Sequence, residues 1–234
     1  MQLPFFYINE YDRSEKLITL DDESARHIVQ VLRMQTGRQL HLTDGKGNLI
    51  TAEISDAHKR HCTAKVVNTS FMEAPIPKIT IAISLLKNNT RFEWFLEKVT
   101  EIGIAEVVPL ICSRTEKQKI RLERMQGILQ SAMLQSRQQW LPKLSEPVMF
   151  QSYIEGEAVK NTPRKFIAHC VENEKSKLCF NNVATLILIG PEGDFTATEI
   201  EQALNAGCSP VSLGINRLRT ETAGVVAATL LKYQ

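Results

Sequence analysis

The chain has 234 residues, of which 43% are hydrophobic, and its 28 Lys and Arg residues outnumber its 26 Asp and Glu residues by only two. This length suffices for one large domain or two modest ones with a buried core. A net charge of +2 argues against a protein that coats nucleic acid nonspecifically.

The cysteines and apolar runs indicate a cytoplasmic protein. The five cysteines form no C-x-x-C pair and the five histidines lack metal-ligand spacing, which favours free thiols and no metal site. The longest apolar runs, such as 79–86, are far shorter than the ~20 residues of a membrane helix. The first ten residues, MQLPFFYINE, lack the basic segment of a secretory signal.

Residues 1–72 predict mainly β-structure. One helix, roughly 23–34, interrupts it after an acidic start, with Ile28, Val31 and Leu32 on one face. A hairpin turn of the D-G class is expected at 44–47. The expected strands cover 4–8, 39–43, 49–54 and 63–69. Two prolines within 73–77 predict a linker at the end of this domain.

After the linker, strands and helices alternate, which is typical of a parallel sheet. Helices are expected over 89–102 and about 120–139. The expected strands are 79–85, 105–111, 165–170, 186–189 and 211–213. Thr196 and Glu199 have capping-box spacing and Gly207 sits at a helix C′ position, so a further helix is predicted over 197–206.

Two glycine-marked turns follow the last two strands. One is Gly190-Pro191-Glu192-Gly193 and the other begins at Gly214. Ligands of open α/β sheets collect at the carboxyl ends of strands, so both turns are candidates for a small-molecule site. The pattern alone leaves open the alternative that they are ordinary turns of an α/β protein.

The sequences of these turns are more specific. GPEG after an apolar strand, followed by LG and then LRTETA at the start of the last helix, resembles the SPOUT-class RNA methyltransferases. Within that class the chain is similar to the 16S rRNA uracil-N3-methyltransferase family, often called RsmE. Three earlier segments match the same family in order: 27–33 with the 44–47 turn, 98–103, and Ser136-Arg137.

Two positions depart from the family pattern. Leu134 stands where a glutamate is expected, which puts in doubt a carboxylate role at that position. Asp194 follows GPEG where a second glycine is commoner. The second change should leave cofactor binding intact, because the GPEG segment itself is unchanged.

The resemblance implies an α/β fold with a PUA-like RNA-binding β-barrel over residues 1–72. A SPOUT domain with a deep trefoil knot follows over residues 73–234. It further implies S-adenosylmethionine as cofactor, N3 of a specific uridine in 16S rRNA of the small ribosomal subunit as target, and a homodimer formed through the knot domain. An apolar final helix, 223–231, agrees with a dimer, although burial within one chain is the alternative.

The two turn segments and the basic cluster of residues 114–124 supply candidate site residues. Arg219 is the candidate for stabilising a uracil anion, and Glu192 and Glu221 are candidates for orienting it or accepting the N3 proton. An alternative for Glu192 is to hold its loop by accepting backbone N–H bonds. The predicted cofactor-binding residues are Ile189, Gly190, Pro191, Glu192, Gly193, Leu213, Gly214, Leu218, Arg219, Thr220, Thr222 and Ala223. The predicted RNA-binding residues are Arg33, Arg114, Lys117, Lys119 and Arg137.

Other functions remain open at this point. A non-catalytic RNA-binding or ribosome-assembly protein could keep the same barrel and knot fold, although it would not need intact GPEG and LRTETA segments. The same reaction on tRNA would use the same knot segments. A solvated helix face is an alternative to phosphate binding for the basic cluster of residues 114–124.

Overall fold

The computed structural model describes residues 2–58, 60–116, 118–171 and 174–233. The chain forms two compact units: Met1–Ala74 with Met133–Leu141, and Pro75–Ala132 with Pro142–Gln234. The first unit therefore takes in residues 133–141, which follow the linker in sequence. Within the described ranges, no helix is long and apolar enough to span a bilayer.

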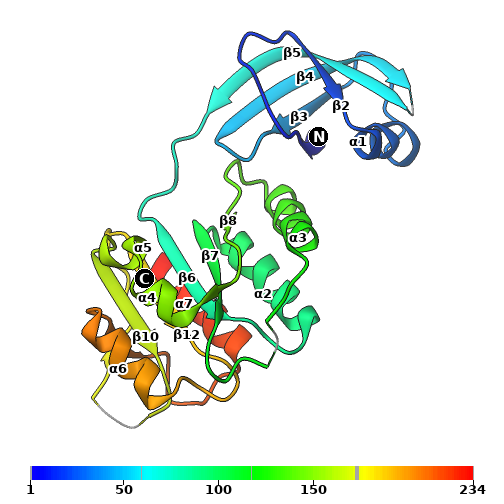
Figure 1. The fold of residues 1–234 in the computed structure, drawn as a ribbon. Helices are drawn as coiled ribbons and strands as arrows, with labels where there is room; N and C mark the ends of the chain where they lie inside the picture. The colour runs from blue at the N-terminus through cyan, green and yellow to red at the C-terminus, as the bar shows by residue number, and fades with distance from the viewer. Residues whose placement is uncertain (1, 59, 117, 172–173, 234) are drawn as a thin grey trace. The chain divides into compact units, whose positions relative to one another are not determined.

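The N-terminal unit is built on a curled sheet (Figure 1). Its described strands lie in the order β1 (Phe5–Tyr7), β3 (Gln39–Thr43), β4 (Asn48–His58), β5 (His61–Phe71) and β2 (Leu17–Leu20). β1 runs parallel to β3, and the other neighbours are antiparallel. Register shifts between β4 and β5 mark bulges, which bend a sheet around its core. The sheet keeps two edges, β1 and β2, so it is a half-barrel rather than a closed barrel.

One short helical segment packs against this sheet. Helix α1 (Asp22–Arg26) begins where the Asp21 carboxylate accepts the Ser24 N–H at 2.7 Å, and it continues as the π-helical turn η1 (His27–Val31). The predicted helix to residue 34 is wrong at its end, because Arg33 has a φ of 51° and leaves the helical region.

Residues 133–141 contact the turn between β3 and β4. The Gly47 N–H donates to the Gln139 carbonyl at 2.8 Å, and the Trp140 indole donates to the Met72 carbonyl at 2.9 Å. Gly47 has a φ of 95°, and a Cβ there would lie 2.8 Å from the Trp140 ring. Glycine is therefore required at position 47 by both conformation and space.

Helix α3 (Leu122–Gln135) is shorter than the predicted span of 120–139. Its helical path ends because Arg137 adopts a φ of 58°. Arg137 therefore lies in a turn and not on the helix. Its guanidinium donates to the Leu3 carbonyl at 3.4 Å, within the N-terminal unit.

The second unit is a parallel sheet, as the alternating pattern predicted. Its described strands lie in the order β11 (Ser176–Lys177), β13 (Ser209–Ser212), β10 (Arg164–Ala168), β12 (Thr185–Ile189), β6 (Ile79–Ser84), β7 (Glu106–Ile111) and β8 (Lys143–Leu144), and β9 (Val148–Met149) also pairs with β7. β6 and β12 are buried along their whole length, which is the pattern of central strands covered on both faces.

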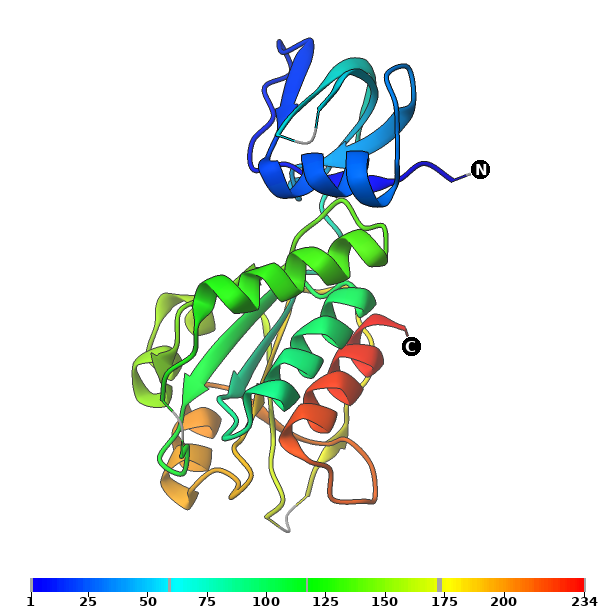
Figure 2. The same cartoon turned by 90° about the vertical axis from the view of Figure 1, so that its right-hand side faces the viewer.

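Helices cover the two faces of this sheet (Figure 2). Helix α2 (Asn89–Ile102) and helix α7 (Thr220–Lys232) lie side by side on one face. Gly224 of α7 lies against the Phe95 ring of α2, with no room for a Cβ. On the other face, α4 (Phe150–Ile154) and α6 (Ala197–Asn205) pack in a core with Phe195, and α5 (Glu157–Lys160) follows α4.

The path into α7 positions the functional site. β13 lies on the far side of β10 from β12, whereas α7 packs against β6 and β12. Residues 213–219 must therefore cross the carboxyl ends of β10 and β12 before α7 begins. This crossing is the chain path that the predicted knot requires.

Candidate functional site

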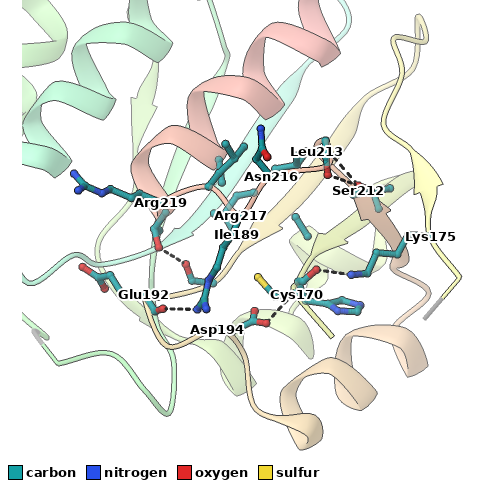
Figure 3. A pocket seen from close by; sticks show the side chains of 18 of the residues that line it. Cys170, Lys175, Ile189, Glu192, Asp194, Ser212, Leu213, Asn216, Arg217 and Arg219 are labelled. Carbon is teal, nitrogen blue, oxygen red and sulfur yellow. Dashed lines mark hydrogen bonds between the residues drawn. The ribbon is translucent and has the colours of Figure 1, made fainter. Parts of the chain in front are cut away.

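A pocket of about 630 Å³ lies at the carboxyl ends of β10, β12 and β13 (Figure 3). Three segments line it: residues 168–170 at the end of β10 with Lys175, residues 189–192 and Asp194 at the end of β12, and residues 211–220 with Ala223 from β13 into α7. Parallel strands bring their carboxyl ends to one edge, so turns distant in sequence meet here.

The turn after β12 is shaped by close packing. A Cβ at Gly190 would lie 3.0 Å and 3.1 Å from two atoms of the buried Phe195 ring, so a larger residue would displace that ring. The Asp194 N–H donates to the Pro191 carbonyl at 2.9 Å and closes the turn. Asp194 has a φ of 65°, a conformation that favours glycine and in which aspartate is among the tolerated exceptions.

A buried hydrogen bond ties this turn to the last helix. The Thr220 hydroxyl donates to the Gly190 carbonyl at 3.0 Å. Thr220 is the first residue of α7, and it is 5% exposed. The bond therefore fixes the crossing segment at the point where it enters the helix.

Arg219 and Glu192 lie at one end of the pocket, and Lys175 lies at the other (Figure 3). Arg219 is the exposed N-cap residue of α7. The neighbouring Arg217 guanidinium donates to the Glu192 carbonyl at 3.4 Å. The Glu192 side chain is itself exposed, and the bonds that hold its loop involve Thr220, Arg114 and Asp194.

Glu221 lies outside the pocket lining. It is 5% exposed, in the first turn of α7, and its Oε1 is 3.8 Å from Nε of Arg91 on α2. Its Oε2 is buried, and no residue in the described part of the chain forms a hydrogen bond with it. The carboxylate is therefore oriented toward α2, unlike Glu192.

The segment after β10 contributes residues that the sequence did not single out. His169 is 8% exposed and lines the pocket, and Lys175 Nζ donates to its carbonyl at 2.7 Å. Burial, reinforced by the Lys175 ammonium, lowers the pKa of His169, against an opposing effect of Asp194. The imidazole is therefore neutral at pH 7. The sequence offered one signal for it, its position near the end of the predicted strand 165–170.

All the predicted cofactor residues except Gly193 and Thr222 line the pocket. Gly193 faces Arg114, because a Cβ there would lie 3.3 Å from the Arg114 Cδ. Several further lining residues were not among the predicted cofactor residues. Some lie outside the family motifs, and others lie beside or between the motif residues: Ala168, His169, Cys170, Lys175, Asp194, Val211, Ser212, Ile215, Asn216 and Arg217. The individual roles of the predicted residues remain predictions.

The predicted RNA-binding residues that the structure describes are divided between the two units. The Arg114 guanidinium donates to the Gly193 carbonyl at 2.6 Å, so it braces the turn after β12. Lys119 is exposed, whereas Lys117 falls outside the described residues. Arg33 and Arg137 belong to the N-terminal unit, where both have positive φ and exposed side chains.

The pocket suits an organic ligand. Its volume lies within the range of small-molecule sites, and its lining combines apolar side chains with backbone groups of two glycine turns. Over the described ranges, no cluster of three or more His, Cys, Asp or Glu side chains could hold a metal ion.

Comparison with known proteins decides the family. A model described as an RNA methyltransferase domain matches residues 72–232, and one described as an RNA methyltransferase PUA domain matches residues 20–67. The chain is 34% identical to a ribosomal RNA small subunit methyltransferase E from Synechocystis, over 91% of this chain and 72% of that protein. The chain belongs to the ribosomal RNA small subunit methyltransferase E family.

Solved structures agree with this family. A probable rRNA-methyltransferase from Porphyromonas gingivalis is 40% identical, with a TM-score of 0.87 over 97% of this chain and 96% of that chain. A ribosomal RNA small subunit methyltransferase E from Neisseria gonorrhoeae, bound to S-adenosyl methionine, is 30% identical with a TM-score of 0.85 and the same coverage. The protein is thus a SPOUT-type α/β methyltransferase with an N-terminal PUA unit, as the resemblance of its sequence segments to this family predicted.

Thr220→Val should destabilise this methyltransferase. Valine keeps the volume but leaves the Gly190 carbonyl without its donor, which costs about 1–3 kcal/mol at a buried site. Thr229→Val is the matched control, because Thr229 lies on the same helix and its hydroxyl donates to the Val225 carbonyl at 2.9 Å at the exposed surface. Urea unfolding of both variants measures the difference, and equal losses would contradict a special role for the bond to Gly190.

Proposed function

We propose that the protein transfers a methyl group from S-adenosylmethionine to N3 of a uridine in 16S rRNA of the small ribosomal subunit. The observation that carries this proposal is the pocket at the crossing of residues 213–219, lined by both family turns. Family membership supports an rRNA substrate, and the S-adenosyl methionine bound to the gonococcal relative supports the cofactor. A ribosomal substrate in turn implies a cytoplasmic protein.

The lining residues fit this cofactor. Gly190 and Gly214 let the backbone approach a ligand closely, and Leu213, Leu218 and Ala223 offer apolar contact. The backbone amides and carbonyls of these residues would form hydrogen bonds with the polar edges of the adenosine moiety. When bound, S-adenosylmethionine supplies the electrophilic methyl group, and the protein contributes orientation and electrostatics.

Arg219 is proposed to stabilise the substrate anion. Uracil N3 loses a proton before or during attack, and the negative charge spreads to the two flanking carbonyl oxygens. A guanidinium at the pocket end would donate hydrogen bonds to those oxygens as the charge develops. The exposed position of Arg219 at the N-terminus of α7 leaves its donors available for this purpose.

Glu192 is the better placed of the two candidate proton acceptors. It is exposed beside Arg219 at the same end of the pocket (Figure 3). Glu221 is buried beside Arg91 and lies outside the lining, which favours an orienting role for it at the start of α7. We therefore assign proton acceptance to Glu192.

We propose different roles for the two parts of the chain. Residues 1–72 would bind rRNA and residues 73–234 would carry the transfer, in agreement with the PUA and methyltransferase matches. Arg33 and Arg137 are exposed cations suited to phosphate contacts, and so is Lys119. Arg114 is less suited, because its guanidinium already binds the Gly193 carbonyl.

The decisive test identifies the methylated nucleoside. Purified protein is incubated with labelled S-adenosylmethionine and small ribosomal subunits that lack the modification, and the digested RNA is analysed by mass spectrometry. We expect label in 3-methyluridine of 16S rRNA. Label in 5-methyluridine would contradict the target atom, and label only in tRNA controls would contradict the substrate. Cofactor binding without label in any RNA would favour a non-catalytic RNA-binding protein.

Arg219→Ala should lower turnover far more than cofactor affinity, because the proposed contact strengthens only as the anion forms. A loss of about a hundredfold or more in kcat is the scale for one such donor. Arg219→Lys keeps the charge without the planar fork and should fall between the two. Steady-state kinetics measure kcat and KM, and near-normal turnover of Arg219→Ala would assign the role to another residue.

The protein is further proposed to form a homodimer through the knot domain. Val225, Val226 and Leu230 of α7 remain only half-buried, and Trp94 of the adjacent α2 is 42% exposed. A second copy could cover these apolar side chains. Sedimentation at micromolar concentration should give about twice the chain mass of 26.4 kDa. A strictly monomeric and fully active protein would contradict the dimer.

A further inference from the structure

The Asp194 side chain, at the end of the turn after β12, has two backbone partners. Its Oδ2 accepts the Cys170 N–H at 2.8 Å, and its Oδ1 accepts the N–H of the adjacent Phe195 at 2.8 Å. Its φ of 65° would be less strained for glycine. The Asp194 carboxylate therefore forms two hydrogen bonds at a position where the backbone conformation favours glycine.

The bond to Cys170 joins two of the three segments that line the pocket (Figure 3). Cys170 follows β10 and Asp194 follows β12, and these strands are neighbours in the sheet, with Ala168 paired to Ile189. Beyond that last pair the ladder ends, and the two segments diverge into separate loops. The Asp194 carboxylate continues the connection past the end of the sheet.

A second contact braces the same turn from outside the pocket. The Arg114 guanidinium donates to the Gly193 carbonyl at 2.6 Å, and a Cβ at Gly193 would lie 3.3 Å from the Arg114 Cδ. Asp194 links the turn to the β10 loop, and Arg114 links it to the segment after β7. The Arg114 contact does not involve Cys170, so it cannot replace the bond between Asp194 and Cys170.

We propose that Asp194 is a positioning residue that holds the 168–170 and 189–194 segments at the spacing at which the cofactor binds. This inference rests on the proposed function. It assigns the role to the hydrogen bond between the carboxylate and the Cys170 amide, not to the negative charge of Asp194. The alternative is a direct charge contact between Asp194 and the cofactor, because Asp194 also lines the pocket.

Three substitutions separate these possibilities. Asp194→Gly removes the bond but relaxes the backbone, Asp194→Ala removes the bond and keeps the unfavourable φ, and Asp194→Asn keeps an oxygen acceptor without the charge. Loss of the bond should lower the fraction of molecules with binding-competent loops, and hence raise the apparent Kd for S-adenosylmethionine about tenfold. Asn should remain within about twofold of the wild type.

Calorimetric titration of the full chain with S-adenosylmethionine measures Kd, and thermal unfolding measures stability. We expect Asp194→Gly to bind about tenfold more weakly while its Tm equals or exceeds that of the wild type. Asp194→Ala should bind as weakly with a lower Tm. Weakened binding in a protein of undiminished stability is a result that a merely structural role would not give. KM for the cofactor should rise in both variants with a smaller change in kcat.

Amide exchange of Cys170 reports on the bond directly. In protein labelled with ¹⁵N-cysteine, the Cys170 amide should exchange faster in Asp194→Gly and Asp194→Ala than in the wild type and Asp194→Asn. Asp12→Gly is the matched control, because the Asp12 carboxylate accepts the Ser14 N–H at 2.9 Å in the N-terminal unit. That variant should leave both Kd and Cys170 exchange unchanged.

Wild-type affinity in Asp194→Gly would overturn the positioning role. Binding by Asp194→Asn as weak as that of Asp194→Gly, with the Cys170 amide still protected, would overturn it in favour of a direct charge contact. Failure of the proposed function gives a different result: the wild type itself would bind no S-adenosylmethionine, and the inference would fall with it.

Discussion

The site depends on one constraint of chain geometry: residues 213–219 must cross the carboxyl ends of two parallel strands before the last helix can cover the sheet. Parallel strands place their carboxyl ends together, so the crossing segment meets the loops that follow β10 and β12. The buried bond from Thr220 to the Gly190 carbonyl fixes where the crossing ends. The same few residues therefore satisfy a backbone polar group and close a ligand pocket.

The surroundings of the pocket show how a binding loop is held without regular structure. The turn after β12 packs against the Phe195 ring. Hydrogen bonds join it to the β10 loop through Asp194 and to the segment after β7 through Arg114. Glu199 extends this support, because its carboxylate caps α6 and also accepts the Ser113 N–H at 2.8 Å. Each contact is modest in energy, and together they restrict the turn to one arrangement.

Much of the fold could be predicted from local signals. The capping box at Thr196 and Glu199, the left-handed Gly103 after α2, and the apolar run of β12 each act over a few neighbouring residues. Short elements such as β2, β8, β9 and α4 were not predicted, because two to five residues give no reliable period. The pocket was only partly predictable. Its glycine turns have motifs, whereas His169 and Lys175 acquire their place through strand order, which no short segment encodes.

The pairing at the centre of the sheet has a consequence for folding kinetics. Strand β6 lies between β12 and β7, and Ile81 pairs with Ile187, so one of the most buried contacts joins residues far apart in sequence. Rates of folding fall as such non-local contacts increase, because the entropy of loop closure is lost before the strands can pair. During synthesis, β6 and β7 are made before β12. The edge of β6 that pairs with β12 therefore stays unpaired until β12 has been made. We therefore expect the same long-range pairing that assembles the pocket to slow the folding of this chain.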